Sequence, residues 1–213
     1  MARTPLDKVT DHFLISYLIN DAFSRRRLRF LPETKLQKLV FLSEKSMVDE
    51  RKKGFNFYFI KLTHGPYSAE LKSELERLIQ IGYLDDFGLR PTASLRLIIE
   101  DFQNVVDKNQ TFFQKIQRVN DAYALMPLRS LLKNIYSMPW GRGDKTIADL
   151  PQRTPMLYPM KPNNIDLEFD ITENEAENLF MNFDPEAIEE LSQATDDMRK
   201  GRVRTYEQVF PNL

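Results

Sequence analysis

The chain has 213 residues, 42% of them hydrophobic, which is enough for one domain of ordinary size with a substantial core. It contains no Cys and two His, so disulfides, thiolate zinc sites and cysteine nucleophiles are excluded. There is no Walker A loop and no GxGxxG fingerprint, and we therefore expect no cofactor and no enzymatic activity. Because we find no run of 18 apolar residues and no signal peptide, we expect a cytoplasmic protein without a membrane partner.

Charge is distributed unevenly along the chain. Residues 1–163 carry 26 basic against 18 acidic side chains, whereas residues 164–213 carry 4 against 13. Close to this change in net charge lie four prolines, which favour an extended connector: Pro151, Pro155, Pro159 and Pro162. The sequence therefore predicts a helical domain at 1–148, a Pro-rich linker at 149–163 and an acidic C-terminal tail at 164–213.

The first predicted helix is capped by Thr4, with Pro5 at its first position. A second helix is expected to start with a capping box formed by Thr34 and Gln37. Between the two helices lies a basic stretch that suits a solvated helix end better than phosphate contacts, although both interpretations stay open. The candidate nucleic-acid contacts in this stretch are Arg25, Arg26, Arg27 and Arg29.

A strand is predicted over residues 55–62, followed by a helix that begins near Thr63 or Gly65, with Pro66 at its first position, and ends at Gly82. A hairpin should follow, with a turn at 85–88 and a returning strand at 95–100. This order is that of a winged helix-turn-helix. The helix that would enter the DNA groove, residues 68–81, has a net negative charge, which disfavours direct contact with DNA. Residues 102–138 are predicted to be helical, and Trp140 is expected to close the core.

The tail is predicted to hold one strand at 165–171 and two short helices, the first capped by Thr172 and Glu175 and the second starting at Asp184. These elements cannot bury their own apolar faces, so we expect the strand to dock on the first domain and the helices to bind a partner. The overall expectation is a mainly α, α+β fold with a winged-helix-like strand and hairpin element. The predicted partner-binding residues are Phe180, Phe183, Ile188, Leu191, Met198, Arg202, Arg204, Tyr206, Val209 and Phe210.

His64 is the residue that raises the question of catalysis, because it precedes a Gly-Pro turn and a charged helix. A catalytic role needs a nucleophile or a metal beside it, and the nearby polar side chains all belong to the turn itself. We therefore favour local packing at a turn formed by His64, Gly65, Pro66, Tyr67 and Ser68.

Several short motifs occur in a characteristic order: TKLQKLVFLSEK at 34–45, HGPYSAEL at 64–71, LIQIGYL at 78–84 and LLKNIYSMPW at 131–140. In this order they resemble the SocA-like or Panacea domain of bacterial and phage antitoxins, over residues 8–145. The stretch MRKGRVRTYEQVF at 198–210 is similar to the ends of many small antitoxins. The resemblance implies a non-enzymatic type II antitoxin that binds a co-encoded toxin.

Other functions stay open at this stage. Some members of the resembled family act as adaptors that deliver a toxin to a protease, so a protease is a further candidate partner. A winged-helix regulator that binds operator DNA, including that of its own operon, is the main alternative of another class. An unrecognised hydrolase that uses His64 is a third hypothesis.

Overall fold

The computed structural model describes residues 3–141, 144–160, 164–200 and 202. Helices dominate, and the strands are short, so the mainly α, α+β expectation is confirmed. The helices are α1 (Pro5–Ser24), α2 (Glu33–Val48), α3 (Ala69–Gln80), α4 (Ala93–Asp101), α5 (Gln103–Lys108), α6 (Gln110–Tyr123), α7 (Leu128–Tyr136), η1 (Ile147–Asp149), α8 (Glu173–Phe183) and α9 (Pro185–Arg199). The strands are β1 (Lys52–Lys53), β2 (Phe59–Leu62), β3 (Gly65–Tyr67), β4 (Leu84–Asp85), β5 (Arg90–Pro91), β6 (Pro155–Leu157) and β7 (Leu167–Glu168).

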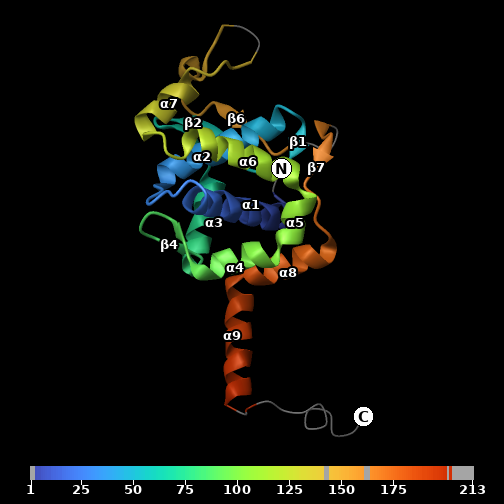
Figure 1. Ribbon diagram of the computed structural model, residues 1–213. Coiled ribbons are helices and arrows are strands. Elements are labelled where there is room, and N and C mark those ends of the chain that lie inside the picture. The colour runs from blue at the N-terminus through green and yellow to red at the C-terminus, as the bar shows by residue number, and fades with distance from the viewer. Residues whose placement is uncertain (1–2, 142–143, 161–163, 201, 203–213) are drawn as a thin grey trace.

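Helix α1 runs through the middle of the body and is covered on several sides by α4, α6 and α8 (Figure 1). It starts as predicted, with a capping box between Thr4 and Asp7 and Pro5 at its first position. Its central residues are buried on every face, as expected for a helix surrounded by others.

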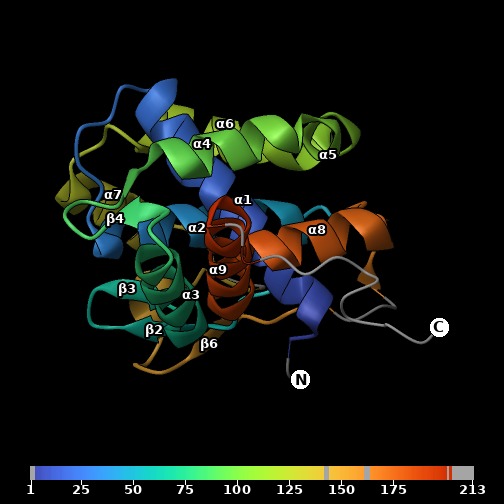
Figure 2. The same cartoon turned by 90° about the horizontal axis from the view of Figure 1, so that it is seen from below.

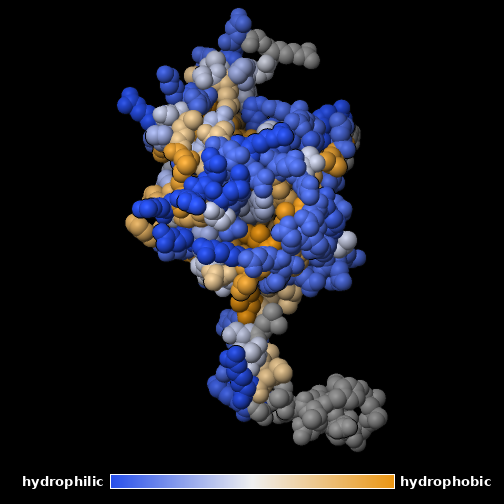
Figure 3. Space-filling model, in the orientation of Figure 1, coloured by the Kyte–Doolittle hydropathy of each residue, from blue (hydrophilic) through white to orange (hydrophobic). Residues whose placement is uncertain are grey.

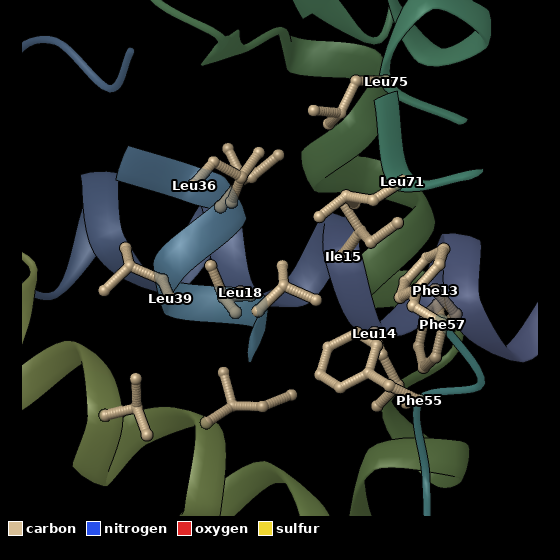
Figure 4. Close-up of a cluster of buried hydrophobic side chains, with 14 of the residues drawn as sticks. Phe13, Leu14, Ile15, Leu18, Leu36, Leu39, Phe55, Phe57, Leu71 and Leu75 are labelled. Carbon is tan, nitrogen blue, oxygen red and sulfur yellow. The ribbon is translucent and has the colours of Figure 1, made fainter. Parts of the chain in front are cut away.

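The main hydrophobic cluster joins α1, α2, α3 and the extended stretch that precedes β2 (Figure 4). The labelled side chains converge from these four segments, and all of them are at most 2% exposed: Phe13, Leu14, Ile15, Leu18, Leu36, Leu39, Phe55, Phe57, Leu71 and Leu75. Burial of each such side chain contributes roughly 1.5–3 kcal/mol. This cluster holds α2 and α3 in fixed positions relative to each other, which matters for the motif turn described below.

Several local predictions were wrong, and the strands expected at 55–62 and 165–171 are limited to β2 and β7. Helix α2 begins at Glu33 after Pro32, and no Thr34–Gln37 capping box forms, because Gln37 is buried and bonds elsewhere. Gly65 and Pro66 belong to β3, and Ser68 is the cap of α3. The returning strand expected at 95–100 is helix α4, capped by Thr92, so the hairpin after α3 consists only of β4 and β5.

The segment predicted as a linker takes part in the body of the protein. Strand β6 pairs with β2 in a three-stranded sheet of order β3-β2-β6, and Met156 and Leu157 are buried. Pro155 is tolerated there because β6 is an edge strand. Further on, β7 pairs in parallel with β1, and Phe169 is buried, so the tail strand docks on the first domain, as expected.

The last two helices behave differently from each other. Helix α8 lies against α1, whereas α9 projects away from the body (Figure 1). Seen from below, α9 points toward the viewer beside α8 and α3 (Figure 2). Fifteen helical residues extend about 22 Å, so α9 forms an arm of considerable length.

Candidate functional site

The first motif of the predicted family contacts the second directly. The side-chain amide of Gln37 on α2 donates to the carbonyl oxygen of Ser68 at 2.9 Å, and the backbone N–H of Ser68 donates to Gln37 Oε1 at 2.9 Å. The Ser68 hydroxyl in turn accepts from the N–H of Leu71 and caps α3. Gln37 therefore fixes the start of α3 to α2.

The rest of the motif turn is also held by the body. Lys38 Nζ donates to the carbonyl oxygen of Pro66 at 2.9 Å, and burial lowers the pKa of Lys38 to about 8. Gly65 has φ +86°, and a Cβ at this position would lie 3.3 Å from a side-chain carbon of Leu132, so both the conformation and the space favour glycine. His64 itself is exposed at the edge of the turn, and Tyr67 is half-buried. The arrangement fits an architectural role for the turn.

The most unusual polar group in the interior is a cluster of Arg3, Asp11, His12 and Glu74, which we call the ionic cluster. Arg3 bridges Asp11 at 2.9 Å and Glu74 at 2.5 Å, and His12 Nε2 lies 2.6 Å from the other oxygen of Glu74. The backbone N–H of Asn56 donates to Asp11 at 2.8 Å. The cluster thus ties the N-terminal segment to α3 and to the chain before β2.

The two carboxylates of the ionic cluster have opposite pKa shifts. Burial raises the pKa of Asp11 to about 7, against the influence of Arg3 and Asn56. For Glu74, burial is outweighed by His12 and Arg3, and the pKa falls to about 2. Glu44, buried on α2, has its pKa raised well above the usual value by burial and by the nearby Asp11. The contacts of Arg3, Asp11, His12 and Glu74 join distant segments of the fold, and within the described ranges no group of His, Asp and Glu is arranged to hold a metal ion.

The ionic cluster was not predicted from the sequence, in which His64 is the histidine beside a Gly-Pro turn. The signal was present: Glu74 follows Leu71 by three residues and so lies on the apolar stripe of α3. Likewise, His12 lies between the apolar residues of α1. A carboxylate on the buried face of a helix requires a buried partner.

Four of the predicted partner-binding residues differ in their exposure. Phe183 is only 2% exposed and packs against the rings of His12 and Tyr83, so it belongs to the core rather than to a binding surface. Ile188 is half-buried against the same core. Phe180 and Met198 are exposed, by 45% and 65% respectively, and are free to meet a partner.

The remaining members lie toward the C-terminus. Arg202 forms ion pairs with Asp196 and Asp197 at the end of α9. Leu191 lies within α9. Four further predicted residues lie outside the described residues: Arg204, Tyr206, Val209 and Phe210.

Helix α9 makes little contact with the rest of the chain. Its first turn is anchored by buried Ala187 and half-buried Ile188, and Asp184 caps it. From residue 192 to the end of α9, every described side chain is exposed or half-buried. Five carboxylates lie on this helix, and two of them, Asp196 and Asp197, pair with Lys200 and Arg202, so the acidic surface is that of its first half.

Figure 3 shows hydrophobic side chains where α9 leaves the body, next to hydrophilic ones. Beside this junction an open groove of about 680 Å³ lies between α1 and α8. It is lined by Pro5, Leu6, Val9, Ile171, Glu173, Ala176, Glu177, Asn178, Phe180 and Met181. Together, α9 and this groove form the candidate protein-binding surface.

The basic stretch after α1 is partly neutralised. Arg25 bonds Asp21 at 2.6 Å and Asp121 at 2.8 Å, and Arg26 lies 3.5 Å from Asp121. Arg27 and Arg29 are exposed. Two of the four candidate phosphate contacts are therefore engaged with carboxylates.

None of the helices in the described ranges is both long enough and apolar enough to span a membrane. Comparisons of the chain with models of protein families, with curated proteins and with solved structures found no match.

Proposed function

We propose that this protein is an antitoxin that neutralises a co-encoded toxin by binding it directly, with α9 as the binding arm. The observation that carries the proposal is the projection of α9 from the body (Figure 1). An isolated helix of about 12–15 residues is marginally stable in water, because packing supplies most of the stability of helices in proteins. Among the described side chains of α9, those that pack on the body belong to its first turn, and a partner is the simplest source of the missing contacts.

The charge of the arm indicates the chemistry of the partner. Carboxylates at Glu186, Glu189 and Glu190 give the first half of α9 a negative surface, whereas Asp196 and Asp197 near its end pair with Arg202. Such a surface accelerates encounter with a basic protein and disfavours acidic ones. A toxin that handles RNA or nucleotides commonly has a basic surface and would suit this arm.

The resemblance to SocA-like and Panacea domains gives the proposal its specific form. Two of the motifs that carry it meet in space, since Gln37 and Lys38 hold Ser68 and Pro66. This contact offers a physical reason for the two motifs to occur together. The contact therefore supports a scaffold shared with SocA-like and Panacea domains. The toxin-binding role is proposed from the resemblance and from α9.

The DNA-binding alternative has weaker support from the charges. The exposed face of α3 carries Glu76 beside Lys72, and Glu74 is buried in the ionic cluster. Arg25 and Arg26 are bound to carboxylates. A helix without net positive charge has no electrostatic attraction to the phosphate backbone.

The test is affinity capture from the native cell with two tagged versions, the full chain and a chain that ends at Asp184. This end point removes α9 but keeps Leu179 and Phe183 in the core. We expect a protein partner with the full chain and a strong loss with the shortened one. Equal recovery from both versions, or recovery of DNA alone, would overturn the proposal.

A further inference from the structure

The groove between α1 and α8 exposes more apolar surface than folding of this chain requires. The side chain of Leu6 on α1 is 47% exposed. On α8, the side chain of Phe180 is 45% exposed and that of Met181 is 41% exposed, and buried Val9 lies between the two helices. The volume of about 680 Å³ is in the range of cavities that accept a ligand or a partner side chain. A contiguous apolar surface of this kind marks an interaction site more often than a single exposed side chain does.

The edge of the groove is acidic. Glu173 and Glu177 line it and are exposed, and neither forms an ion pair with any residue in the described part of the chain. Glu175, on the same helix, points elsewhere and binds Lys108 at 2.6 Å. The groove therefore combines an apolar lining with uncompensated negative charge.

Helix geometry explains this division of α8. Glu173, Glu177 and Phe180 follow one another at intervals of four and three residues, so they share one face. Leu179 and Phe183 lie on the other side and are buried in the core. The outer face of α8 continues directly into the acidic α9, because only Asp184 separates the two helices.

We propose that this groove accepts an amphipathic segment of the partner protein, in which large apolar side chains are flanked by Lys or Arg. The inference rests on the proposed function and deepens it, because it adds a second contact to that made by α9. The apolar side chains would occupy the space between Leu6 and Phe180, and the cations would meet Glu173 and Glu177. A partner that is bound to α9 holds its segment close to the groove. The effective concentration of this segment at the groove therefore rises, and binding at the groove has the same effect at α9.

Two other occupants fit the charges less well. A second copy that used the same face would place Glu173 and Glu177 close to their own counterparts, and like charges repel. The chain's own residues 203–213 contain one Arg and one Glu, so they offer no net positive charge to the acidic edge.

The experiment uses the full chain in the native cell, with the photo-crosslinking residue p-benzoylphenylalanine in place of Phe180. The same residue in place of Met198 reports on α9, and in place of Phe87, which is 83% exposed on the β4–β5 hairpin, it serves as control. We expect crosslinks from positions 180 and 198 to the same protein and none from position 87. Mass spectrometry of the 180 adduct should identify a peptide with Lys or Arg beside large apolar residues.

A charge variant tests the edge of the groove with the captured partner. Glu177→Lys should lower the association rate constant about tenfold at low salt, since steering by charge changes association rates by this order or more. The matched variant Glu100→Lys, at an exposed position on α4, should leave the rate unchanged.

The outcomes separate the groove from the proposed function. A crosslink from position 198 without one from position 180 overturns the proposed binding at the groove and leaves the proposed role of α9 intact. An adduct from 180 with a peptide of this same chain, or with an acidic peptide, also overturns it. If neither position crosslinks, both proposals fail. If both positions crosslink to a basic partner that is not toxic, the groove stands and the antitoxin function falls.

Discussion

Replacement of Glu74 by Ala tests whether the ionic cluster stabilises the fold. The side chain of Glu74 is 8% exposed and contacts both Arg3 and His12. Its pKa falls from 4.5 to about 2 in the folded protein, which corresponds to roughly 3 kcal/mol of interaction with the ionised carboxylate. Removing one member of a buried ion pair costs about 3–5 kcal/mol. We therefore expect Glu74→Ala to lower the free energy of unfolding by about 3 kcal/mol.

Urea unfolding followed by the fluorescence of Trp140, the single tryptophan, measures this loss. The matched control is Glu76→Ala on the same helix, because Glu76 is 64% exposed and lies 3.7 Å from Lys72. Its effect should stay below about 0.5 kcal/mol. Since the pKa of Glu74 is lowered, its stabilising effect is present above pH 4.5 and disappears as the pH falls toward about 2. Equal losses for the two variants at neutral pH would refute the reasoning.

Three further predictions concern the core, the motif turn and the response to pH. Phe183→Ala should lower the free energy of unfolding by about 3 kcal/mol, because its ring is buried. Phe180→Ala should change the free energy of unfolding by less than about 0.5 kcal/mol, because its ring is exposed. Denaturant titration of both variants checks this difference. Gln37→Ala leaves the buried backbone N–H of Ser68 without its partner and removes one of two donors to the Ser68 carbonyl oxygen, and it should cost about 2 kcal/mol in the same assay. Burial raises the pKa of Asp11 from 3.8 to about 7, so its contribution to stability is greatest below pH 3.8 and is lost as the pH rises to about 7. Over this window the free energy of unfolding of Asp11→Asn should depend less on pH than that of the unmodified protein, and an equal dependence in both would contradict the assigned shift.

Local sequence rules located the elements whose signals do not depend on distant contacts. Thr4 with Pro5, Thr172 with Glu175, and Asp184 with Pro185 start helices where their capping chemistry predicts. The apolar stripe of α3 was also predicted, as was its end before Gly82. In these cases the residues that determine the element lie within one turn of it.

Some of the wrong predictions arose where tertiary contacts override local preference. Gln37 bonds to Ser68, 31 residues away, and so is not free for a capping box with Thr34. The strand predicted at 95–100 was wrong for a local reason, because Thr92 caps a helix there, and Leu95 and Ile98 face the core from it. The change of charge near residue 163 predicts a separate tail module, but α8 packs on α1, so Phe183 lies in the core and not on a partner-binding surface. The groove was not foreseen, because Leu6 and Phe180 meet only in the folded chain.

The most direct test of the antitoxin account is a growth assay with the captured partner. The partner is expressed alone, with the full chain, with the chain that ends at Asp184, and with Glu74→Ala as a control for lowered stability. The account predicts that the partner alone arrests growth, that the full chain restores it, and that the chain without α9 does not. Growth that is unaffected by the partner, or restored equally well without α9, would contradict the central claim.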